Sequence, residues 1–496
     1  MITDGIFYQA KKHPEQQAII THQGSISYTE LATTTRKIAG MVHKEHTLKS
    51  LYRPLRAGLL LPNSRTFLEC FLGISHSGNI CAPLDPKWTN HQLNDVIHFS
   101  MIDLLFTTDS LLKRIDLHRF KGKVIVVNSV SWMRKQNLSA DSPRSSQRDF
   151  YLGYTSGTTG KPKGFLRNHE SWTESFRASN DHFLISETDT VAAPGPFVHS
   201  LSLYAAIHAL SMGASFYITE QFHPVKFIND ITTYNISTLY VVPTMLEAIL
   251  RFPDKMKNVH LSKIISSGDK LSQKTEEKIT NLLPQASLFE FYGASETSFI
   301  TVLDHKHKPK NAQTVGKPFN NVEISIRDRD GQEVEADEIG MLYIKSNMLF
   351  TGYDQLPEQT REIFDGDWMT AGDLAKRDSD GFIYLAGRKK NMIISGGLNV
   401  YPEEVESVIK NYPGITQTAV LGLPDPYWGE KVVALLLESE SIQCTDSMLD
   451  AYSRMYLPTY KCPKCWIRLS EFPYTSSGKI AKKILKSSLM KDMIHR

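Results

Sequence analysis

Cysteine is scarce in this sequence, and its five cysteines do not suggest a disulfide framework. An odd number of cysteines in a chain of 496 residues is typical of a reducing compartment, so we expect a cytoplasmic protein. Cys462 and Cys465 have the spacing of a zinc-ligand pair, but no second pair with zinc-like spacing stands nearby. We therefore interpret both as structural residues.

Long apolar runs and blocks of like charge are also missing. No run approaches the roughly 20 apolar residues that a membrane-spanning helix requires, so no membrane span is predicted. The first residues contain neither the basic region nor the apolar core of a signal peptide, so no signal peptide is expected. The net charge of +3 is spread along the chain, which argues against a nucleic-acid partner.

The composition is that of a globular protein with more than one folding unit. Hydrophobic residues make up 41% of the chain and charged residues 22%, enough to bury a large core. Short apolar runs that read as strands alternate with helical patterns, and the run 57–62 has the continuous apolar character of a strand buried on both faces. The sequence therefore predicts an α/β fold of parallel sheets covered by helices. The expected strands are 18–21, 25–28, 57–62, 104–107, 124–127 and 239–242.

A glycine-rich stretch, Tyr154–Gly164, combines three glycines with four Ser/Thr hydroxyls and two lysines. Glycine permits positive φ, and consecutive turn N–H groups can converge on an anion. Hydroxyls add donors and lysines add positive charge. The alternative is an ordinary exposed loop. It is not a Walker A loop, because Pro162 stands five residues after Gly157, where that pattern requires glycine.

This stretch resembles the phosphate loop of the AMP-forming acid–thiol ligases, a superfamily that includes acyl- and aryl-CoA synthetases, peptide-synthetase adenylation domains and firefly luciferase. The resemblance covers nearly the whole chain, with five motifs in family order. It implies a large N-terminal domain of helix-covered β-sheets and a small, mobile α+β C-terminal domain. It also implies that this loop binds the ATP phosphates through Thr155, Ser156, Gly157, Thr158, Thr159, Gly160 and Lys163.

A second motif, Glu290–Glu296, carries residue types that suit a nucleotide. The Tyr292 ring could stack on adenine, and Glu290 could accept a hydrogen bond from the adenine amino group. Ser295 and Glu296 offer the hard oxygen ligands that Mg²⁺ requires. The alternative from the residues alone is a capped helix start. The resemblance favours the nucleotide site, with Ser295 and Glu296 catalytic and Glu296 the metal ligand.

Two further motifs are expected to contact the carboxylic acid substrate. From the residues alone, His199 would be read as a hydrogen-bonded structural histidine. The segment Pro196–His199 resembles a family element that lines the acyl channel, and this resemblance makes His199 a candidate for contact with the acid. The expected strand at 264–266 runs into a glycine turn, and the resemblance places Ser267 beside the acyl group and Gly268 beside the nucleotide.

Later motifs are assigned to the ribose and to a domain boundary. Asp373 resembles the family aspartate that binds both ribose hydroxyls, and Arg388 resembles its ribose-contacting arginine. A charged break precedes a strand and a glycine pair, which favours a boundary between domains 1–387 and 388–496. The resemblance makes Lys390 the hinge.

The last motifs concern the thiol and the adenylation step. The resemblance implies that CoA passes close to the backbone at Gly396 and Gly397, and that Lys479 reaches the carboxylate and the α-phosphate. From the residues alone, Lys479 would be read as a solvated lysine in a polar turn.

The function that the resemblance implies is an acid–CoA ligase that uses ATP, Mg²⁺ and CoA to activate a carboxylic acid, with a fatty acid favoured. One alternative is an adenylation enzyme that loads an acyl or amino acid onto a carrier protein in trans. A luciferase-like monooxygenase and a non-catalytic nucleotide-binding protein are the others. Ala371 and Asn391, which depart from the family motifs, keep the last alternative open.

Overall fold

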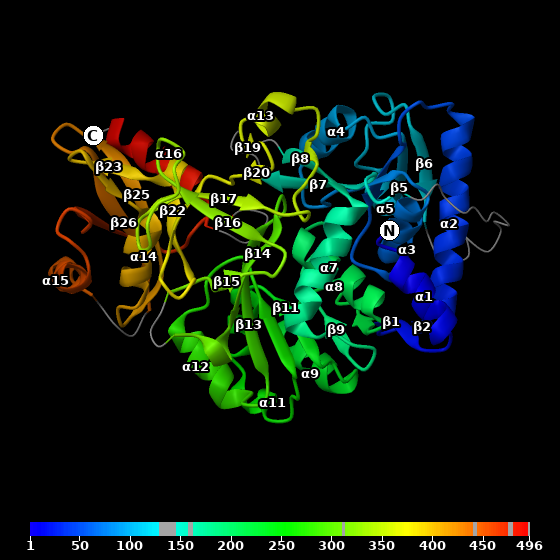
Figure 1. Ribbon diagram of the computed structural model, residues 1–496, viewed down its shortest axis with the longest axis horizontal. Coiled ribbons are helices and arrows are strands. Elements are labelled where there is room, and N and C mark those ends of the chain that lie inside the picture. Colours follow the sequence, from blue (N-terminus) through cyan, green and yellow to red (C-terminus); the bar gives the residue numbers. More distant parts are fainter. Residues whose placement is uncertain (128–144, 157–161, 310–312, 440–443, 475–479, 495–496) are drawn as a thin grey trace. The chain divides into compact units, whose positions relative to one another are not determined.

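The computed structural model describes residues 1–127, 145–156, 162–309, 313–439, 444–474 and 480–494, with the side chains of Ser156 and 491–494 excepted. The chain forms two compact units. The first comprises Met1–Glu323 and Lys345–Asp367, and the second comprises Ile324–Ile344 and Trp368–Arg496. Both units combine sheets with covering helices, which confirms the predicted α/β class with a large and a smaller part (Figure 1).

One sheet of the first unit is mostly parallel, and its central strands are buried on both faces. Its strand order is β18–β8–β7–β4–β3–β5–β6, with β3 parallel to both β4 and β5. Every residue of β3 is buried, as its continuous apolar run predicted. The strands are β18 (Gly352–Tyr353), β8 (Pro162–Asn168), β7 (Asp149–Ser156), β4 (Ile80–Pro83), β3 (Arg56–Leu60), β5 (Leu104–Thr107) and β6 (Lys123–Val126).

The second sheet of this unit has the order β15–β14–β13–β12–β11–β9–β10–β1–β2. Its central strands, from β13 through β10, are parallel, so their carboxyl ends meet at one edge. The strands are β15 (Lys317–Pro318), β14 (Ser298–Asp304), β13 (Ser287–Ala294), β12 (Lys263–Ser266), β11 (Thr238–Val241), β9 (Thr190–Ala192), β10 (Ser215–Tyr217), β1 (Gln17–Thr21) and β2 (Gly24–Ser27).

Helices cover these sheets, and several of them begin at a Ser, Thr or Asn whose side chain caps the first turn. The spacing of Ser27 and Glu30 predicts a capping box, and the structure forms it at the start of α2: the Glu30 N–H donates to Ser27 Oγ, and the Ser27 N–H donates to Glu30 Oε2. The helices are α1 (Asp4–Lys12), α2 (Tyr28–Leu48), α3 (Arg65–His76), α4 (Asn90–Phe99), α5 (Asp109–Leu112), α7 (His169–Phe183), α8 (Ser200–Met212), α9 (Pro224–Thr233), α10 (Pro243–Ile249), α11 (Pro253–Met256), α12 (Gln273–Leu282) and α13 (Pro357–Arg361). Two short elements, η1 (His305–His307) and β19 (Phe364–Asp365), complete this unit.

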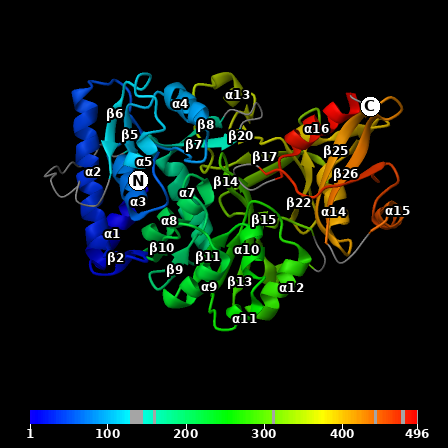
Figure 2. The same ribbon diagram turned by 180° about the vertical axis from the view of Figure 1, so that it is seen from behind.

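The second unit holds two smaller sheets (Figure 2). In the first, the strands run in the order β20–β17–β21–β22, and β16 pairs with β17. In the second, the order is β24–β23–β26–β25, and β27 pairs with β26. The bounds are β16 (Glu323–Arg327), β17 (Gly340–Lys345), β20 (Trp368–Met369), β21 (Asp373–Arg377), β22 (Ile383–Arg388), η2 (Lys389–Asn391), β23 (Ile393–Ser395), β24 (Leu398–Val400), β25 (Ile415–Asp425), β26 (Gly429–Glu438) and β27 (Cys465–Arg468).

Helices α14 (Pro402–Lys410), α15 (Asp446–Tyr456) and α16 (Lys482–Ile494) bury both faces of the β25–β26 pair. One core cluster joins this pair to α14 and α15, and Cys462 belongs to it. A second cluster joins the other face to α16 through Leu485. From the residues alone, 422–425 would be read as an ordinary turn, but this reading is wrong. These residues are the last four of β25, because the strand continues through them in its pairing with β26.

Candidate active site

Predicted site residues of the first unit gather at the carboxyl ends of the parallel strands. Ser267 and Gly268 follow β12, and Glu290 and Tyr292 lie in the last part of β13. His199 follows β9 after the turn that precedes α8. Because the carboxyl ends of parallel strands open onto one crevice, this edge is where an α/β fold binds its ligand.

The glycine-rich stretch connects the two strands of a hairpin. Strand β7 pairs with β8 antiparallel, and Thr155 lies opposite Lys163 in the register. The ammonium of Lys163 lies 3.0 Å from the ring centroid of Tyr353, a cation–π contact. The predicted phosphate ligands Gly157, Thr158, Thr159 and Gly160 lie outside the described residues, and only the backbone of Ser156 is described.

Tyr353 also connects this hairpin to the second motif. Its hydroxyl donates to Glu296 Oε1 at 3.3 Å, and Ser200 Oγ donates to Ser295 Oγ at 3.1 Å. The chain of contacts from Lys163 through Tyr353 to Glu296 brings two predicted site residues together. Glu296 is half-buried, and a carboxylate beside a hydroxyl is a donor set that fits Mg²⁺.

The turn before Glu296 requires glycine at position 293. A Cβ atom there would lie 1.8 Å from the backbone oxygen of Ser298, closer than any side chain permits. The alternative of a helix start at this motif is wrong, because residues 287–294 form β13 and turn directly into β14.

A buried arginine, which no sequence motif indicated, holds the turn between β13 and β14 in place. Arg167 is 2% exposed, and its guanidinium donates to the carbonyl oxygens of Ser295 and Met348, each at 2.7 Å. It also donates to the hydroxyls of Ser171 and Ser298. Burial lowers the pKa of Arg167 to about 10, so the side chain is still charged at neutral pH. Arg167 therefore holds Ser295 and, through it, the position of Glu296.

The predicted acyl-binding residues lie at the same strand edge. His199 is the residue before α8, and the preceding turn is held by Asn63, which donates to the Gly195 carbonyl and accepts from the Phe197 N–H at 2.9 Å each. Ser267 is 9% exposed and its N–H donates to the Val241 carbonyl.

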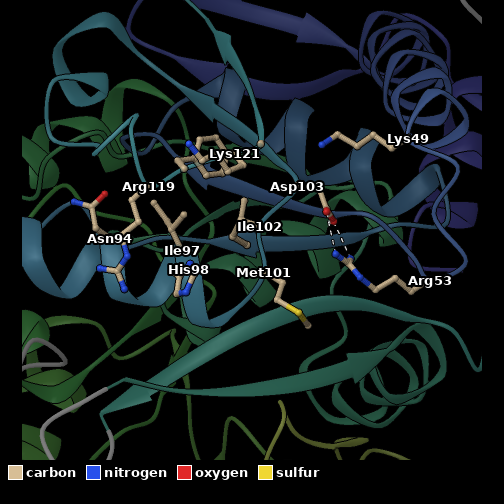
Figure 3. A pocket seen from close by; sticks show the side chains of 12 residues that line it. Lys49, Arg53, Asn94, Ile97, His98, Met101, Ile102, Asp103, Arg119 and Lys121 are labelled. Atoms are coloured by element: carbon tan, nitrogen blue, oxygen red, sulfur yellow. Dashed lines mark hydrogen bonds and ion pairs between the residues drawn. The ribbon is translucent and has the colours of Figure 1, made fainter.

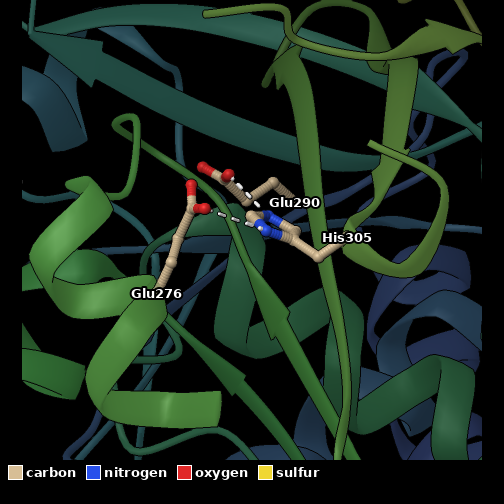
Figure 4. A group of neighbouring side chains, drawn as sticks. All are labelled: Glu276, Glu290 and His305. Carbon is tan, nitrogen blue, oxygen red and sulfur yellow. Dashed lines mark hydrogen bonds and ion pairs between the residues drawn. The ribbon is translucent and has the colours of Figure 1, made fainter. Parts of the chain in front are cut away.

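Glu290, His305 and Glu276 form an ion-pair network in which the imidazole lies between the two carboxylates (Figure 4). Its Oε1 is 2.8 Å from His305 Nε2 and 3.3 Å from Lys270 Nζ, and its Oε2 accepts from the Leu271 N–H at 2.9 Å. Glu276 lies on the other side of the imidazole, with Oε2 3.5 Å from His305 Nδ1. Three ligand atoms of Glu276, Glu290 and His305 lie within 4.8 Å of one another, as in a metal site.

The charges around these three side chains favour ion pairing over metal binding. Lys308 Nζ lies 2.6 Å from Glu276 Oε1, and Lys270 pairs with Glu290. Both ring nitrogens of His305 face carboxylate oxygens, an arrangement in which each donates only when the ring is protonated. We therefore interpret the network as a clamp of ion pairs.

A cavity of about 320 Å³ lies elsewhere in the first unit (Figure 3). It is lined by residues of α4 and of the segments around Arg53 and Arg119, and Arg53 points to Asp103 with nitrogen–oxygen distances of 2.8 and 2.9 Å. None of the residues predicted to contact ATP, acid or CoA lines this cavity. It is therefore not part of the candidate active site.

In the second unit, the structure brings the two predicted ribose residues together. Asp373 begins β21, Arg388 ends β22, and the two are register partners. Arg388 Nε donates to Asp373 Oδ1 at 3.0 Å. Asp373 is 8% exposed, whereas the Arg388 side chain is 43% exposed. Lys390 follows in η2.

The glycine pair makes a tight turn between β23 and β24. Gly396 and Gly397 have φ values of +60° and +78°, the left-handed pair that a two-residue hairpin turn requires. Nothing in the described chain would lie within 4 Å of a Cβ on Gly397. Lys479 lies outside the described residues, but α16 begins three residues later with Lys482, whose Nζ lies 2.6 Å from Glu406 Oε1.

Two family models match this chain. The AMP-binding enzyme model matches residues 6–354, and the AMP-binding enzyme C-terminal domain model matches residues 404–479. The chain therefore belongs to the AMP-binding enzyme family, which confirms its assignment to the AMP-forming acid–thiol ligases.

Relatives of similar length carry acyl–CoA ligase names. The chain is 35% identical over 493 residues to the uncharacterized acyl–CoA ligase YhfT of Bacillus subtilis, which covers 97% of this chain and 96% of that protein. It is 31% identical to the putative long chain fatty acid–CoA ligase VraA of Staphylococcus epidermidis, with 99% and 98% covered.

Solved structures of adenylate-forming enzymes share the fold. ATP-bound MatB from Rhodopseudomonas palustris matches with a TM-score of 0.88 and 25% identity, over 98% of this chain and 99% of that one. The o-succinylbenzoate CoA synthetase MenE from Bacillus subtilis, in complex with its acyl-adenylate intermediate, matches with a TM-score of 0.85 and 25% identity, over 97% and 98%. Throughout the described part of this chain, no helix combines the length and apolar character needed to cross a membrane.

Proposed function

We propose that this protein is a cytoplasmic fatty acid–CoA ligase that converts a carboxylic acid, ATP and CoA into an acyl-CoA, AMP and pyrophosphate. In the first step, a carboxylate oxygen attacks the α-phosphorus of ATP and pyrophosphate leaves. In the second, the CoA thiol attacks the carbonyl carbon of the acyl-AMP, a proton is lost from sulfur and AMP leaves. The observation that carries the proposal is the chain of contacts from Lys163 through Tyr353 to Glu296, in the unit of an AMP-binding enzyme that also holds Gly268 and Tyr292.

The residues suit a reaction between two anions. At about 4 Å, a pair of like unit charges costs ~1 kcal/mol in water and ~4 kcal/mol at an effective dielectric constant of about 20. We assign Lys163 to the leaving phosphates, and Lys479 to the carboxylate and the α-phosphate. Ser295 and Glu296 would hold Mg²⁺, which neutralises phosphate charge when bound. No protein nucleophile is required.

The two steps need different groups beside one acyl carbon. We assign Lys479 to the first step and the Gly396–Gly397 turn to CoA entry in the second. A hinge at Lys390, between domains 1–387 and 388–496, would present each in turn. The open backbone at Gly397 supports a close approach by a thin thiol arm. The same turn would serve a carrier-protein thiol, so CoA and an acyl carrier protein are both tested below.

The fatty acid is supported by the relatives named as long chain fatty acid–CoA ligases. The test is pyrophosphate release against straight-chain acids of increasing length, aromatic acids and amino acids, each with CoA, with an acyl carrier protein, and with neither thiol. The proposal expects the highest kcat/KM for a straight-chain acid, with thioester formed on CoA. Preference for an amino acid, or thioester on the carrier protein alone, would overturn it.

Replacing Asp373 with asparagine is expected to weaken ATP binding. The carboxylate accepts from Arg388 and is assigned to the ribose hydroxyls, so a neutral amide loses charge-assisted bonds on both sides. We expect KM for ATP to rise roughly tenfold, which corresponds to about 1.4 kcal/mol, while KM for the acid stays unchanged. Asp380→Asn, at an exposed aspartate in the β21–β22 hairpin, is the matched control. If both variants had the same KM for ATP, the assignment of Asp373 to the ribose site would be wrong.

A further inference from the structure

His305 connects two segments that flank the nucleotide end of the proposed site. It lies in η1, directly after β14, and β14 pairs with the strand that carries Glu290 and Tyr292. Glu276, its other partner, lies in the first turn of α12. The imidazole therefore sits between helix α12 and the strand that follows it, β13, and pairs with a carboxylate of each (Figure 4).

The network reaches the proposed nucleotide contacts through Glu290. One carboxylate oxygen binds His305 and Lys270, and the other accepts from the Leu271 N–H at 2.9 Å. Leu271 lies three residues after Gly268, whose φ of +100° marks a turn that only glycine adopts without strain. Glu290 therefore holds this turn through its bond to the Leu271 N–H. Glu290 also lies in the same strand as Tyr292, two residues before it.

The three side chains of the clamp are largely shielded from water, so an unbalanced charge among them would be unfavourable. The side chain of His305 is 11% exposed, that of Glu290 7% and that of Glu276 17%. Three cations face the two carboxylates: His305, Lys270 and Lys308. Lys270 lies before α12, and Lys308 directly follows η1. A neutral imidazole would turn a bare nitrogen lone pair toward one of the carboxylates, an unfavourable contact in a site with little water.

We propose that His305 is a positioning residue for nucleotide binding: as an imidazolium between Glu276 and Glu290, it holds the Gly268–Leu271 turn and strand β13 in the arrangement that receives the adenine end of ATP. This inference rests on the proposed function, because that function places a nucleotide against Gly268 and Tyr292. It gives Glu290 a task besides the predicted contact with adenine, since both of its oxygens bind groups of the protein.

The protonation states of the clamp set the pH window. Burial disfavours the imidazolium, but the hydrogen bonds and charges of Glu276 and Glu290 outweigh it and raise the pKa of His305 above 6.5. Burial opposes ionisation of Glu276 as well, yet His305 and Lys308 lower its pKa to about 2. The clamp is therefore complete below pH 6.5 and is lost as the pH rises through the folded-state pKa of His305, while both carboxylates stay charged.

The test is the affinity of the full-length protein for AMP, measured by calorimetry from pH 6 to pH 9 in the wild type, His305→Gln, His305→Lys and His307→Gln. AMP binding needs no knowledge of the acid. His307 is the matched control, because its side chain is 82% exposed and pairs only locally, with Asp304. The ionisation of AMP is common to all four proteins, so it cancels in the ratio of each variant to the wild type.

We expect His305→Gln to weaken AMP binding by roughly 3- to 30-fold at pH 6, with the ratio to wild type falling toward one as the pH rises. His305→Lys keeps a permanent cation, so its affinity should stay close to that of wild type at pH 6 and exceed it at pH 9. A ratio for His305→Gln that equals that of His307→Gln, or that is constant with pH, would overturn the positioning role. If His305→Gln does not fold, the His305→Lys comparison decides alone: a constant ratio to wild type overturns the role. Wild-type protein that binds no AMP would instead overturn the proposed function, and this inference with it.

Discussion

Lys479→Ala is expected to abolish acid-dependent exchange of pyrophosphate into ATP while leaving thioester formation from supplied acyl-AMP largely intact. Lys479 is assigned to the charge that develops between the carboxylate and the α-phosphorus, which exists only in the first step. Loss of one preorganised cation or donor at such a position typically costs about 10²–10³ in rate. The exchange assay and the acyl-AMP assay together separate the two half-reactions.

A lysine elsewhere in the second unit provides the control for this variant. Lys410 is the exposed last residue of α14, and Lys410→Ala should leave both half-reactions unchanged. If Lys479→Ala lowered both half-reactions equally, the lysine would serve the fold or both steps, and the assignment to adenylation would be wrong.

The second large effect is expected on the free energy of unfolding when Arg167 is replaced. Arg167→Met removes donors from the carbonyl oxygens of Ser295 and Met348 in a site that is 2% exposed. Breaking a buried charged network of this kind costs about 3–5 kcal/mol in the free energy of unfolding. Because Ser295 precedes Glu296, we also expect kcat/KM for ATP to fall in the protein that stays folded.

Urea unfolding of the full-length variants measures this cost. Arg177→Met is the matched control, since the Arg177 side chain on α7 is 77% exposed and its pair with Glu174 should contribute less than about 1 kcal/mol. Arg167→Lys keeps the charge but not the planar fork of donors, so it should fall between wild type and methionine. Unfolding midpoints that agree for Arg167→Met and Arg177→Met would contradict the role of Arg167 as the support of this turn.

Local patterns in the sequence predicted much of the fold. The apolar run at β3, the capping box at Ser27 and the strand at 104–107 all depend on interactions with close neighbours in the chain or on burial alone, and each is found as expected. Residues 422–425 differ from the sequence-based reading because Gly422 and Pro424 favour a turn locally, whereas pairing with β26 keeps these residues extended.

The supporting residues of the site could not be predicted in the same way. Arg167 meets Ser295 across 128 residues of sequence, and Tyr353 meets Glu296 across 57. A lone arginine near the end of a strand carries no local signal of such a role. His305 stands in the run His-Lys-His, which reads as a solvated turn, and only the fold shows that one of the two histidines is buried between carboxylates. Asp373 and Arg388 were both predicted from motifs, but their pairing needed the β21–β22 register.

The most direct test of the central claim follows the oxygen atoms of the acid. The enzyme is supplied with ATP, CoA and an accepted straight-chain acid whose carboxylate carries ¹⁸O, and the products are analysed by mass spectrometry. If the carboxylate attacks the α-phosphorus and the thiol then attacks the carbonyl carbon, one labelled oxygen must appear in AMP and one must remain in the acyl-CoA. Label in inorganic phosphate with formation of ADP, or AMP without label, would contradict adenylate formation by this protein.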